Sequence, residues 1–473
     1  MSIQGVVTTG IYCRADCTAK PHPENVRALP NAVTALAQGY RPCLRCRPDR
    51  LPDLGLAAAS PTVAFALRLV ADGFLDEHDT EALAARVGYS ARQLVRLFEQ
   101  EIGASPDFVA RAQRAHLARR LLDESDLPIT AVAFAAGFNS VRQMNRVVHA
   151  LFGLPPSELR RRRRRGDLLE ALDGGLRLRV PYRGRLDARR MIQALARRAI
   201  PGVEEVVDGV YRRTINTCGH PGVAEVRDAG DGRHLEVTLH LATFASVLEQ
   251  VRRCRSLFGL TRGDDAAGPA LARDPRLGPL VRRNPGLRLH GAWDAFETGV
   301  RVLVGQQVSV AGASTVCGRL VARFGRPVAQ LTGSLRALFP TPSALADAGE
   351  RDFDMPRARA RAIIGFARAV AGGELDLYRA ESFDDTVARL VRLPGIGPWS
   401  AGLIAARVFD HADAFPAGDL GLRNGAAHLI GRTDALDPRE LERLSAAWRP
   451  WRTTAAAYLW LLTAPTVAAG VGG

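Results

Sequence analysis

The pattern of hydrophobic and polar positions divides this chain into stretches of different character. Residues 60–165 have a helical pattern after a proline-rich linker, "RPDRLPDLGLAAASP". Residues 176–252 mix strand-like alternation, as in "HLEVTLHL", with a helix, which predicts a small sheet-bearing α+β subdomain. The pattern over 253–470 is helical, with loops expected at "GRPVAQLTGS" and "FPTPSAL". A chain of 473 residues is too long for one core, so we predict a multidomain, mainly α protein.

Two segments of the first helical stretch resemble each other. They are "LAARVGYSARQLVRLFEQEIGASP" and, about 50 residues later, "VAFAAGFNSVRQMNRVVHALFGLPP". Each has a helix with small residues, a turn of glycine and an aromatic residue, and a second helix that a serine can cap. The turns and caps are Gly88-Tyr89 with Ser90, and Gly137-Phe138 with Ser140. One such helix pair can be plain core packing, but two in tandem predict a pair of helix-turn-helix units.

An arginine–glutamine pair lies in the first turn of each second helix, as Arg92-Gln93 and Arg142-Gln143. Recognition helices reach base edges there, where arginine suits guanine and glutamine suits adenine. The second unit ends in "FGLPPSELRRRRRR", and the whole stretch, 60–165, resembles the AraC-type DNA-binding domain. We interpret the arginine run 160–165 as a linker that attracts phosphates.

The charge of the chain indicates a polyanionic partner. Lys and Arg number 64 against 49 Asp and Glu, which gives a formal net charge of +15. Double-stranded DNA is the first candidate, and a membrane surface is a weaker one. No secretory signal pattern opens the chain, and no apolar run reaches the ~18 residues that span a bilayer. We therefore expect a cytoplasmic, nucleoid-associated protein, where clustered cysteines serve as metal ligands more often than as disulfides.

Four of the seven cysteines lie before residue 47, as Cys13-x3-Cys17 and Cys43-x2-Cys46. Two close pairs joined by a loop supply the four thiolates of a tetrahedral Zn²⁺ site. The alternative is four unconnected buried cysteines. The ten histidines form no spaced set of ligands. The sequence therefore predicts one structural or reactive zinc site.

The residues around these cysteines resemble the N-terminal domain of Ada-type adaptive-response proteins over 1–52. The resemblance rests on "TTGIYCRADC", "ENVRAL" and "GYRPCLRCRPD". It implies that Cys13 accepts a methyl group from a methylphosphotriester in DNA, while the other three cysteines complete the ligand set. The chain starts only twelve residues ahead of Cys13, so the domain is shorter at its N-terminus than in the family. A misassigned start and a trimmed domain that binds zinc without methyl transfer both stay open.

The stretch "LVRLPGIGPWSAGLIAARVF" predicts two helices joined by a glycine hairpin. Gly395, Ile396 and Gly397 form the turn, and Pro398 begins the second helix. Glycines leave room for a phosphate, and their N–H groups, with the helix N-terminus, point toward it. Because a bare turn uses the same residues, this motif alone is moderate evidence for DNA binding.

Past the hairpin, "DAFPAGDLGLRNG" carries Asp419. With "GLRLHGAWDAFETGVRVLVGQQVSV" and "WRPWRTTAAAYLW", the sequence resembles the DNA-3-methyladenine glycosylase II (AlkA) branch of the helix-hairpin-helix superfamily over residues 176–465. The resemblance implies that Asp419 is the catalytic carboxylate. It also implies that an alkylated purine is flipped out of the duplex and stacked on aromatic rings.

The same resemblance identifies a base pocket of Trp399, Trp460 and Leu403, and places Gln307 where the family has an apolar wedge. Trp399 occupies the position at which strand-cleaving relatives carry a lysine, so we expect a monofunctional glycosylase. We expect Trp448 and Trp451 to lie in the helix core. The superfamily also implies a monovalent cation on hairpin carbonyls, with Val391, Leu393 and Ile396 as candidate ligands.

Together these features predict an alkylation-damage response protein with a zinc methyl acceptor, a transcriptional regulator and a glycosylase. We expect a monomer that also contacts RNA polymerase. No four-cysteine cluster follows the hairpin and no Pro-Cys-His-Arg motif occurs, which excludes an iron–sulfur glycosylase and an alkylguanine methyltransferase. Two alternatives stay open: a regulator with an inactive glycosylase scaffold, and a glycosylase whose N-terminal half only tethers it to DNA.

Overall fold

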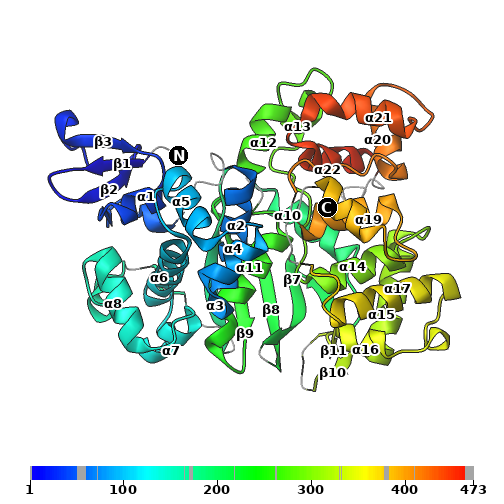
Figure 1. Cartoon of the computed structure of the whole chain (residues 1–473), viewed down its shortest axis with the longest axis horizontal. Coiled ribbons are helices and arrows are strands. Elements are labelled where there is room, and N and C mark those ends of the chain that lie inside the picture. The colour runs from blue at the N-terminus through cyan, green and yellow to red at the C-terminus, as the bar shows by residue number, and fades with distance from the viewer. Residues whose placement is uncertain are drawn as a thin grey trace, which may run out of the picture. The chain divides into compact units, whose positions relative to one another are not determined.

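The computed structural model describes residues 3–463 except 51–59, 72, 165, 170–173, 218, 262–263, 330, 332, 378–382 and 410 (Figure 1). The proline-rich linker, Arg165 and the predicted domain end at 464–470 therefore lie partly or wholly outside the described residues. The chain divides into two compact units. The first comprises Met1–Tyr182 and Arg212–Cys254, and the second comprises Arg183–Tyr211 and Arg255–Gly473.

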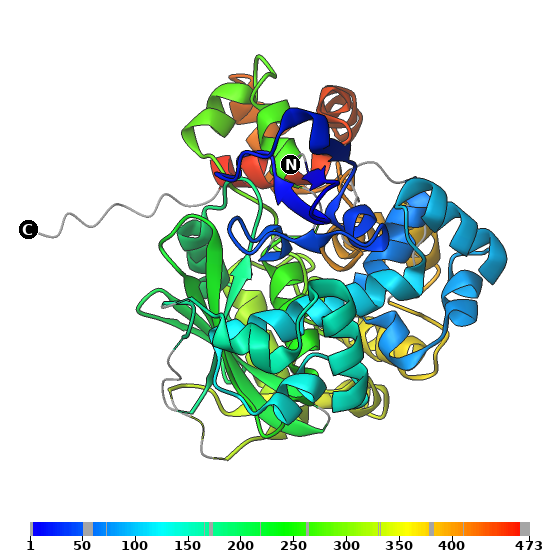
Figure 2. The same ribbon diagram turned by 90° about the vertical axis from the view of Figure 1, so that its left-hand side faces the viewer.

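The first unit begins with a small four-stranded sheet of order β3-β1-β2-β4 (dark blue in Figure 2). Strand β1 pairs antiparallel with β2 and β3, whereas β4 pairs parallel with β2. Asn31 caps α1 by accepting a hydrogen bond from the N–H of Thr34. The elements are β1 (Ile3–Val6), β2 (Ile11–Arg14), β3 (Val26–Leu29), α1 (Ala32–Ala37) and β4 (Arg41–Pro42), with short 3-10 turns at Pro23–Asn25 and Pro48–Arg50.

Two helix-turn-helix units follow, as predicted. Ser90 and Ser140 each accept a hydrogen bond from the N–H three residues on, which confirms both as N-caps. The turns use Gly88 and Gly137 with φ of +79° and +82°, a conformation that glycine adopts without strain. The helices are α2 (Pro61–Ala71), α3 (Phe74–Glu77), α4 (Thr80–Arg86), α5 (Ala91–Glu101), α6 (Pro106–Glu124), α7 (Ile129–Ala135), α8 (Val141–Phe152) and α9 (Pro156–Arg161).

A buried ion network joins the zinc domain to α6, the helix between the two helix-turn-helix units. Arg47 donates to Asp49 and, at 2.7 Å, to Asp123 of α6; these three side chains are at most 5% exposed. Arg119 lies 3.1 Å from Asp123 on the same helix. Because an uncompensated charge inside a protein is costly, each member of this network holds the others in place.

The predicted sheet-bearing region forms a five-stranded sheet of order β5-β9-β8-β7-β6, which confirms the expectation. Strand β9 pairs antiparallel with both β5 and β8. The elements are β5 (Leu176–Pro181), α10 (Ala188–Ala196), β6 (Glu204–Val207), β7 (Val210–Thr217), β8 (His220–Asp228), β9 (His234–His240), the turn Phe244–Ser246 and α11 (Val247–Leu257).

The rest of the second unit is helical around two hydrophobic cores. One core lies among α14, α15, α17 and α19, and the other includes Trp448, Leu422 and Leu459. The helices are α12 (Asp264–Leu271), α13 (Gly278–Arg283), α14 (Ala295–Val304), α15 (Val310–Phe324), α16 (Pro342–Ala346), α17 (Arg357–Ala371), α18 (Phe383–Leu390), α19 (Pro398–Val408), α20 (Leu420–Leu429), α21 (Pro438–Ser445) and α22 (Arg452–Thr463). Two-residue strands lie at β10 (Arg326–Pro327) and β11 (Ala337–Leu338), and 3-10 turns at Glu350–Asp352 and Ala446–Trp448.

One local expectation changes in this unit and another holds. The expected loop at "FPTPSAL" is wrong in part, because Thr341 caps a short helix there and Pro342 begins it as α16. Trp448 is a core residue, 2% exposed, as expected, and Trp451 packs partly buried against the same core. Among the described residues, no helix combines the length and the apolar character needed to cross a bilayer.

The contact between α20 and α22 gives a first prediction. A Cβ on Gly425 would lie 2.2 Å from the carbonyl oxygen of Leu459, so Gly425→Ala must push the two helices apart. We expect a loss of about 1–3 kcal/mol in unfolding free energy, as for other overpacked sites. Gly365→Ala is the matched control, because nothing lies within 4 Å of its Cβ and alanine favours a helix. Thermal unfolding of both variants tests this, and equal melting temperatures would contradict it.

Candidate functional site

The helix-hairpin-helix forms as predicted between α18 and α19. The N–H of Ile396 donates to the carbonyl of Leu393 at 3.1 Å, and the Ile396 side chain is buried beneath the turn. Gly395 has φ +84°, and a Cβ there would lie 2.4 Å from that of Ala362, so only glycine fits. Gly395 and Gly397 are both exposed. Pro398 is the first residue of α19, which leaves the helix N-terminus open to a ligand.

Asp419 lies at the start of α20 and holds both predicted stacking residues. Its Oδ1 accepts a hydrogen bond from the N–H of Leu422 at 2.9 Å, which makes it the N-cap. The indole N–H of Trp399 donates to Oδ2 at 2.7 Å, and that of Trp460 donates to Oδ1 at 2.8 Å. The structure thus gathers three residues that are 20 and 41 positions apart in the sequence.

Leu403 lies one turn after Trp399 on α19, so the two side chains share a face of the helix. Both are partly buried against the core among α14, α15, α17 and α19. The predicted pocket residues Trp399, Trp460 and Leu403 therefore come from α19 and α22, and the two tryptophans meet at the carboxylate of Asp419.

Gln307 lies in the connection between α14 and α15, is exposed and has φ +55°, an uncommon conformation for a residue with a side chain. Its neighbour Gln306, which sequence analysis did not single out, donates to the carbonyl of Gly395 at 3.0 Å and to Ser400 Oγ at 2.9 Å. Gln306 therefore ties the connection that carries Gln307 to the hairpin. The only signal for it in the sequence is a polar pair inside an apolar segment.

A second residue that the sequence analysis missed is Arg198, just after α10. Burial and the neighbouring guanidinium groups of Arg301 and Arg197 lower the pKa of Arg198 to about 10, while Asp419 opposes the shift. A cation thus lies within electrostatic range of the carboxylate. No motif marks it, because α10 precedes Asp419 by more than 200 residues.

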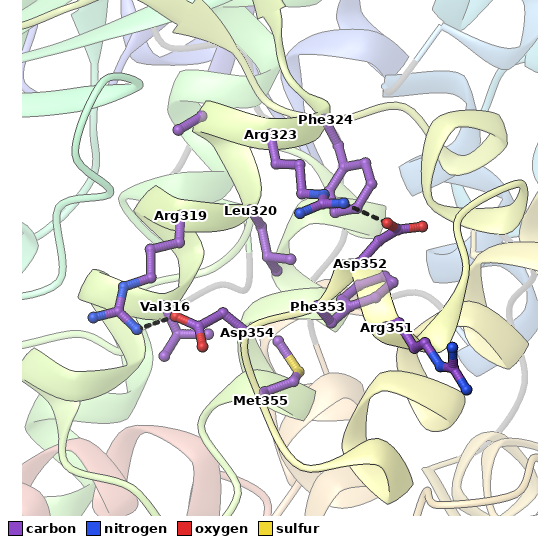
Figure 3. Close-up of a pocket in the computed structure, with 11 residues that line it drawn as sticks. Val316, Arg319, Leu320, Arg323, Phe324, Arg351, Asp352, Phe353, Asp354 and Met355 are labelled. Carbon is purple, nitrogen blue, oxygen red and sulfur yellow. Dashed lines mark hydrogen bonds and ion pairs between the residues drawn. The ribbon is translucent and has the colours of Figure 1, made fainter.

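A hollow of about 540 Å³ lies beside the C-terminal half of α15 (Figure 3). Its lining mixes apolar and charged side chains, and two of its three arginines, Arg319 and Arg323, form ion pairs with Asp354 and Asp352. None of the residues predicted for the base pocket lines it, so the hollow is separate from those residues.

The four N-terminal cysteines converge, with all Sγ atoms within 4.8 Å of one another. The pairing of β2 with β4 brings the two motifs together, since the N–H of Cys43 donates to the carbonyl of Tyr12. A tetrahedral zinc site with Zn–S bonds of about 2.3 Å has sulfurs about 3.8 Å apart. The cluster needs only small adjustments to meet that geometry.

The chemistry of the four sulfurs also fits a divalent cation. Burial, with the charges of the neighbouring cysteines, raises the pKa of Cys46 to about 12 and also raises the pKa of Cys13. Hydrogen bonds from its neighbours instead lower the pKa of Cys43, against the effect of burial. Because thiolates this close repel one another, a bound cation would be needed to hold four of them together. Backbone N–H groups donate to the sulfurs of Cys17, Cys43 and Cys46 at 3.4–3.5 Å. Among the described hydrogen bonds, Cys13 Sγ receives no backbone donor.

The two glutamines of the predicted recognition helices have a role that the sequence analysis did not assign to them. The side-chain carbonyl of Gln93 accepts from Ser90, and that of Gln143 accepts from the N–H of Asn139. Both glutamines therefore cap their own helices, which gives a second reason for their repeated position beside the predicted base contact. The arginines beside them, Arg92 and Arg142, are exposed.

One turn beyond these arginines, Arg96 and Arg146 are exposed on the same faces of α5 and α8. The sequence analysis missed this second pair. The sequence signal for this pair is an arginine four positions after Arg92 in α5 and four positions after Arg142 in α8.

The interpretation of residues 160–165 as a linker is wrong for Arg160 and Arg161, which belong to helix α9. The other described arginines of the run also contact protein. Arg163 pairs with Asp126 at 2.6 Å, and Arg164 donates to the carbonyls of Leu44 and Arg45, inside the second cysteine motif. The run thus contacts both its own domain and the zinc domain as well as carrying charge.

The fold and the site define a DNA-binding protein in which an Ada-type zinc domain and tandem helix-turn-helix units precede a helix-hairpin-helix glycosylase. Family models agree, with the metal binding domain of Ada over residues 3–49, a helix-turn-helix domain over 83–162, the AlkA N-terminal domain over 177–294 and the HhH-GPD superfamily base excision DNA repair protein over 300–450. The chain is 41% identical over 461 residues to the probable bifunctional transcriptional activator/DNA repair enzyme AlkA of Mycobacterium tuberculosis, covering 97% of this chain and 92% of that one. The chain belongs to this family.

Two further relatives match the C-terminal half. DNA-3-methyladenine glycosylase 2 of Escherichia coli is 30% identical over 273 residues, which are 57% of this chain and 92% of the relative. The solved structure of a 3-methyladenine DNA-glycosylase from Archaeoglobus fulgidus aligns with a TM-score of 0.53 at 20% identity, covering 60% of this chain and 97% of that one. The latter likeness shows a shared fold.

The cysteine geometry predicts one zinc ion per chain. Cys17→Ser should lower the zinc content measured by elemental mass spectrometry, because a serine hydroxyl is not a thiolate donor. Cys254→Ser and Cys317→Ser are matched controls, since both cysteines are buried outside the cluster, and their zinc content should equal that of the wild type. Zinc content that does not depend on Cys17 would contradict the assignment.

Proposed function

We propose that the C-terminal half excises alkylated purines such as 3-methyladenine from duplex DNA, with Asp419 as the catalytic carboxylate. The observation that carries this proposal is the convergence of Asp419, Trp399 and Trp460 beside the hairpin. The named activities of the relatives agree with it. Domain bounds of 176–252 and 253–470 for this half belong to the same proposal.

The chemistry follows from the charge of the damaged base. Alkylation at a ring nitrogen makes the purine cationic and weakens its glycosidic bond. The N–H groups of Gly395 and Gly397 bind a backbone phosphate, Gln307 fills the space left by the flipped nucleotide, and the indole rings stack on the base. As the bond breaks, the carboxylate of Asp419 stabilises the positive charge on the sugar, and water completes the hydrolysis.

The reaction ends at an abasic site. A glycosylase that also cuts the strand needs an amine to form a Schiff base with the sugar. At the corresponding position this chain has Trp399, whose indole cannot act as such a nucleophile. As a further proposal, the carbonyls of Val391, Leu393 and Ile396 hold a monovalent cation that reinforces phosphate binding by the hairpin.

We infer that the zinc domain, residues 1–52, accepts a methyl group on Cys13. When bound, zinc keeps the four sulfurs as thiolates at neutral pH. Cys13 lacks a backbone donor in the described hydrogen bonds, so its sulfur retains more electron density than the other three. The Cys13 sulfur attacks the methyl carbon of a methylphosphotriester. An S–C bond forms as the C–O bond breaks, and the phosphodiester anion leaves.

Methylation changes the formal charge of four thiolates and Zn²⁺ from −2 to −1, which lowers repulsion from DNA. We propose that residues 60–165 then bind a promoter through Arg92 and Arg142, with Gln93 and Gln143 holding the recognition helices, and contact RNA polymerase. On this proposal the protein acts in the cytoplasm on the nucleoid, as a monomer.

Excision by Asp419 is tested with methylated duplex DNA. Asp419→Asn should lower the single-turnover rate of base release by roughly 100-fold or more, because the amide cannot offset the charge on the sugar. Asp437→Asn is the matched control, since Asp437 also caps a helix, α21, and is exposed.

The Asp419 result also separates the alternative functions. No base release by the wild type would favour a regulator on an inactive scaffold. Equal rates for the wild type and Asp419→Asn would overturn the role of Asp419.

Methyl acceptance is tested by mass spectrometry after incubation with methylphosphotriester DNA. We expect the mass of one methyl group on the peptide that contains Cys13, and none in Cys13→Ser. An unchanged mass would favour an N-terminal half that only tethers the glycosylase. A methyl group on Cys17 or Cys46, the two more exposed cysteines, would move the acceptor to that residue.

A further inference from the structure

The carboxylate of Asp419 receives a hydrogen bond from each of the two tryptophans proposed for base stacking. Trp399 donates to Oδ2 at 2.7 Å and Trp460 donates to Oδ1 at 2.8 Å. We propose that both tryptophans are positioning residues, which orient the carboxylate of Asp419 through their indole N–H groups. This inference rests on the proposed catalytic role of Asp419.

The three donors constrain the carboxylate on both oxygens. With the N–H of Leu422 at 2.9 Å from Oδ1, the plane of the carboxylate is fixed by two side chains and the first turn of α20. Hydrogen bonds to a charged acceptor are stronger than those between neutral groups. An indole N–H donates and cannot accept, so both indole bonds end on oxygens of the carboxylate. The arrangement therefore fixes the direction in which the carboxylate faces a cationic sugar.

The packing of α20 against α22 makes this contact possible. A Cβ on Gly421 would lie 3.0 Å from Cδ1 of Trp460 and 3.1 Å from both its Nε1 and Oδ1 of Asp419. One turn later, Gly425 lets the backbone of α22 approach at Leu459, the residue before Trp460. Two glycines four positions apart thus clear the space in which the indole reaches the carboxylate.

The other tryptophan connects Asp419 to the hairpin. Trp399 is the second residue of α19, directly after Gly397 and Pro398. The turn proposed to bind the DNA phosphate is therefore two residues from a side chain that holds the carboxylate. Both indoles are partly buried against hydrophobic cores, so their N–H groups are fixed before DNA arrives.

Phenylalanine substitutions separate this role from stacking. Trp399→Phe and Trp460→Phe keep an aromatic ring and remove the N–H. We expect each to lower the single-turnover rate of release from methylated duplex DNA by about tenfold to a hundredfold, the usual range for losing a hydrogen bond to a charged group. The loss should fall on this rate and not on affinity for damaged DNA, because the ring that stacks on the base is retained.

Matched variants control for folding and stacking. Trp451→Phe changes a partly buried tryptophan in the second core and should leave the rate unchanged. Gly421→Ala keeps both indoles but crowds Trp460, so it should also lower the rate and tests the same contact without removing a ring. Affinity for a duplex with a tetrahydrofuran abasic analogue should stay near the wild-type value in every variant.

The outcomes distinguish this inference from the proposed function. Loss of activity in Asp419→Asn together with wild-type rates in both phenylalanine variants would overturn the positioning role alone. Phenylalanine variants that lose affinity for damaged DNA but keep the wild-type single-turnover rate would assign these tryptophans to stacking only. Full activity in Asp419→Asn would overturn the proposed function itself.

Discussion

The close approach of α20 and α22 is the constraint on which the candidate active site depends. Asp419 begins one of these helices and Trp460 lies near the end of the other. Their contact exists because Gly421 and Gly425 have no side chains to separate the backbones. Packing normally stabilises a fold by burying apolar area, but here it also determines where a carboxylate faces.

Charged residues have two uses in this chain, long-range attraction and local ion pairing. The excess of basic residues gives long-range attraction to a polyanion, yet many arginines have protein partners. In the first unit, Arg47 and Asp123 form a buried pair between the zinc domain and α6. In the second, Arg301 is held by Glu204 and Glu297, and these carboxylates contribute to raising its pKa against the effect of burial. On α5 and α8, four arginines remain exposed, and these are the ones that the proposed function assigns to DNA contact.

Much of the fold could be predicted from the sequence because its signals are local. Serine caps, glycine turns and a proline at the start of α19 act within a few residues, and Ser90, Ser140 and Pro398 are confirmed in those places. The motif around Asp419 also identified the position of the carboxylate. The hydrogen bonds that hold it could not be predicted, since they join residues on separate helices whose contact depends on tertiary packing.

The roles of three glutamines could not be predicted for a related reason. Gln306 carries no local pattern, and its role appears only when the hairpin lies beside it. Gln93 and Gln143 fitted two explanations, because an amide near a helix start suits both base recognition and capping. The hydrogen bonds to Ser90 and Asn139 show the capping role, while base recognition stays a prediction.

The capping glutamines carry an evolutionary consequence for the regulator. A side chain committed to starting its own helix cannot be exchanged freely when a new promoter must be recognised. Drift in operator preference would then fall on the neighbouring arginine positions, whose side chains are exposed. Relatives with different target genes should thus differ at the counterparts of Arg92, Arg96, Arg142 and Arg146 while keeping an amide or a carboxylate at the cap.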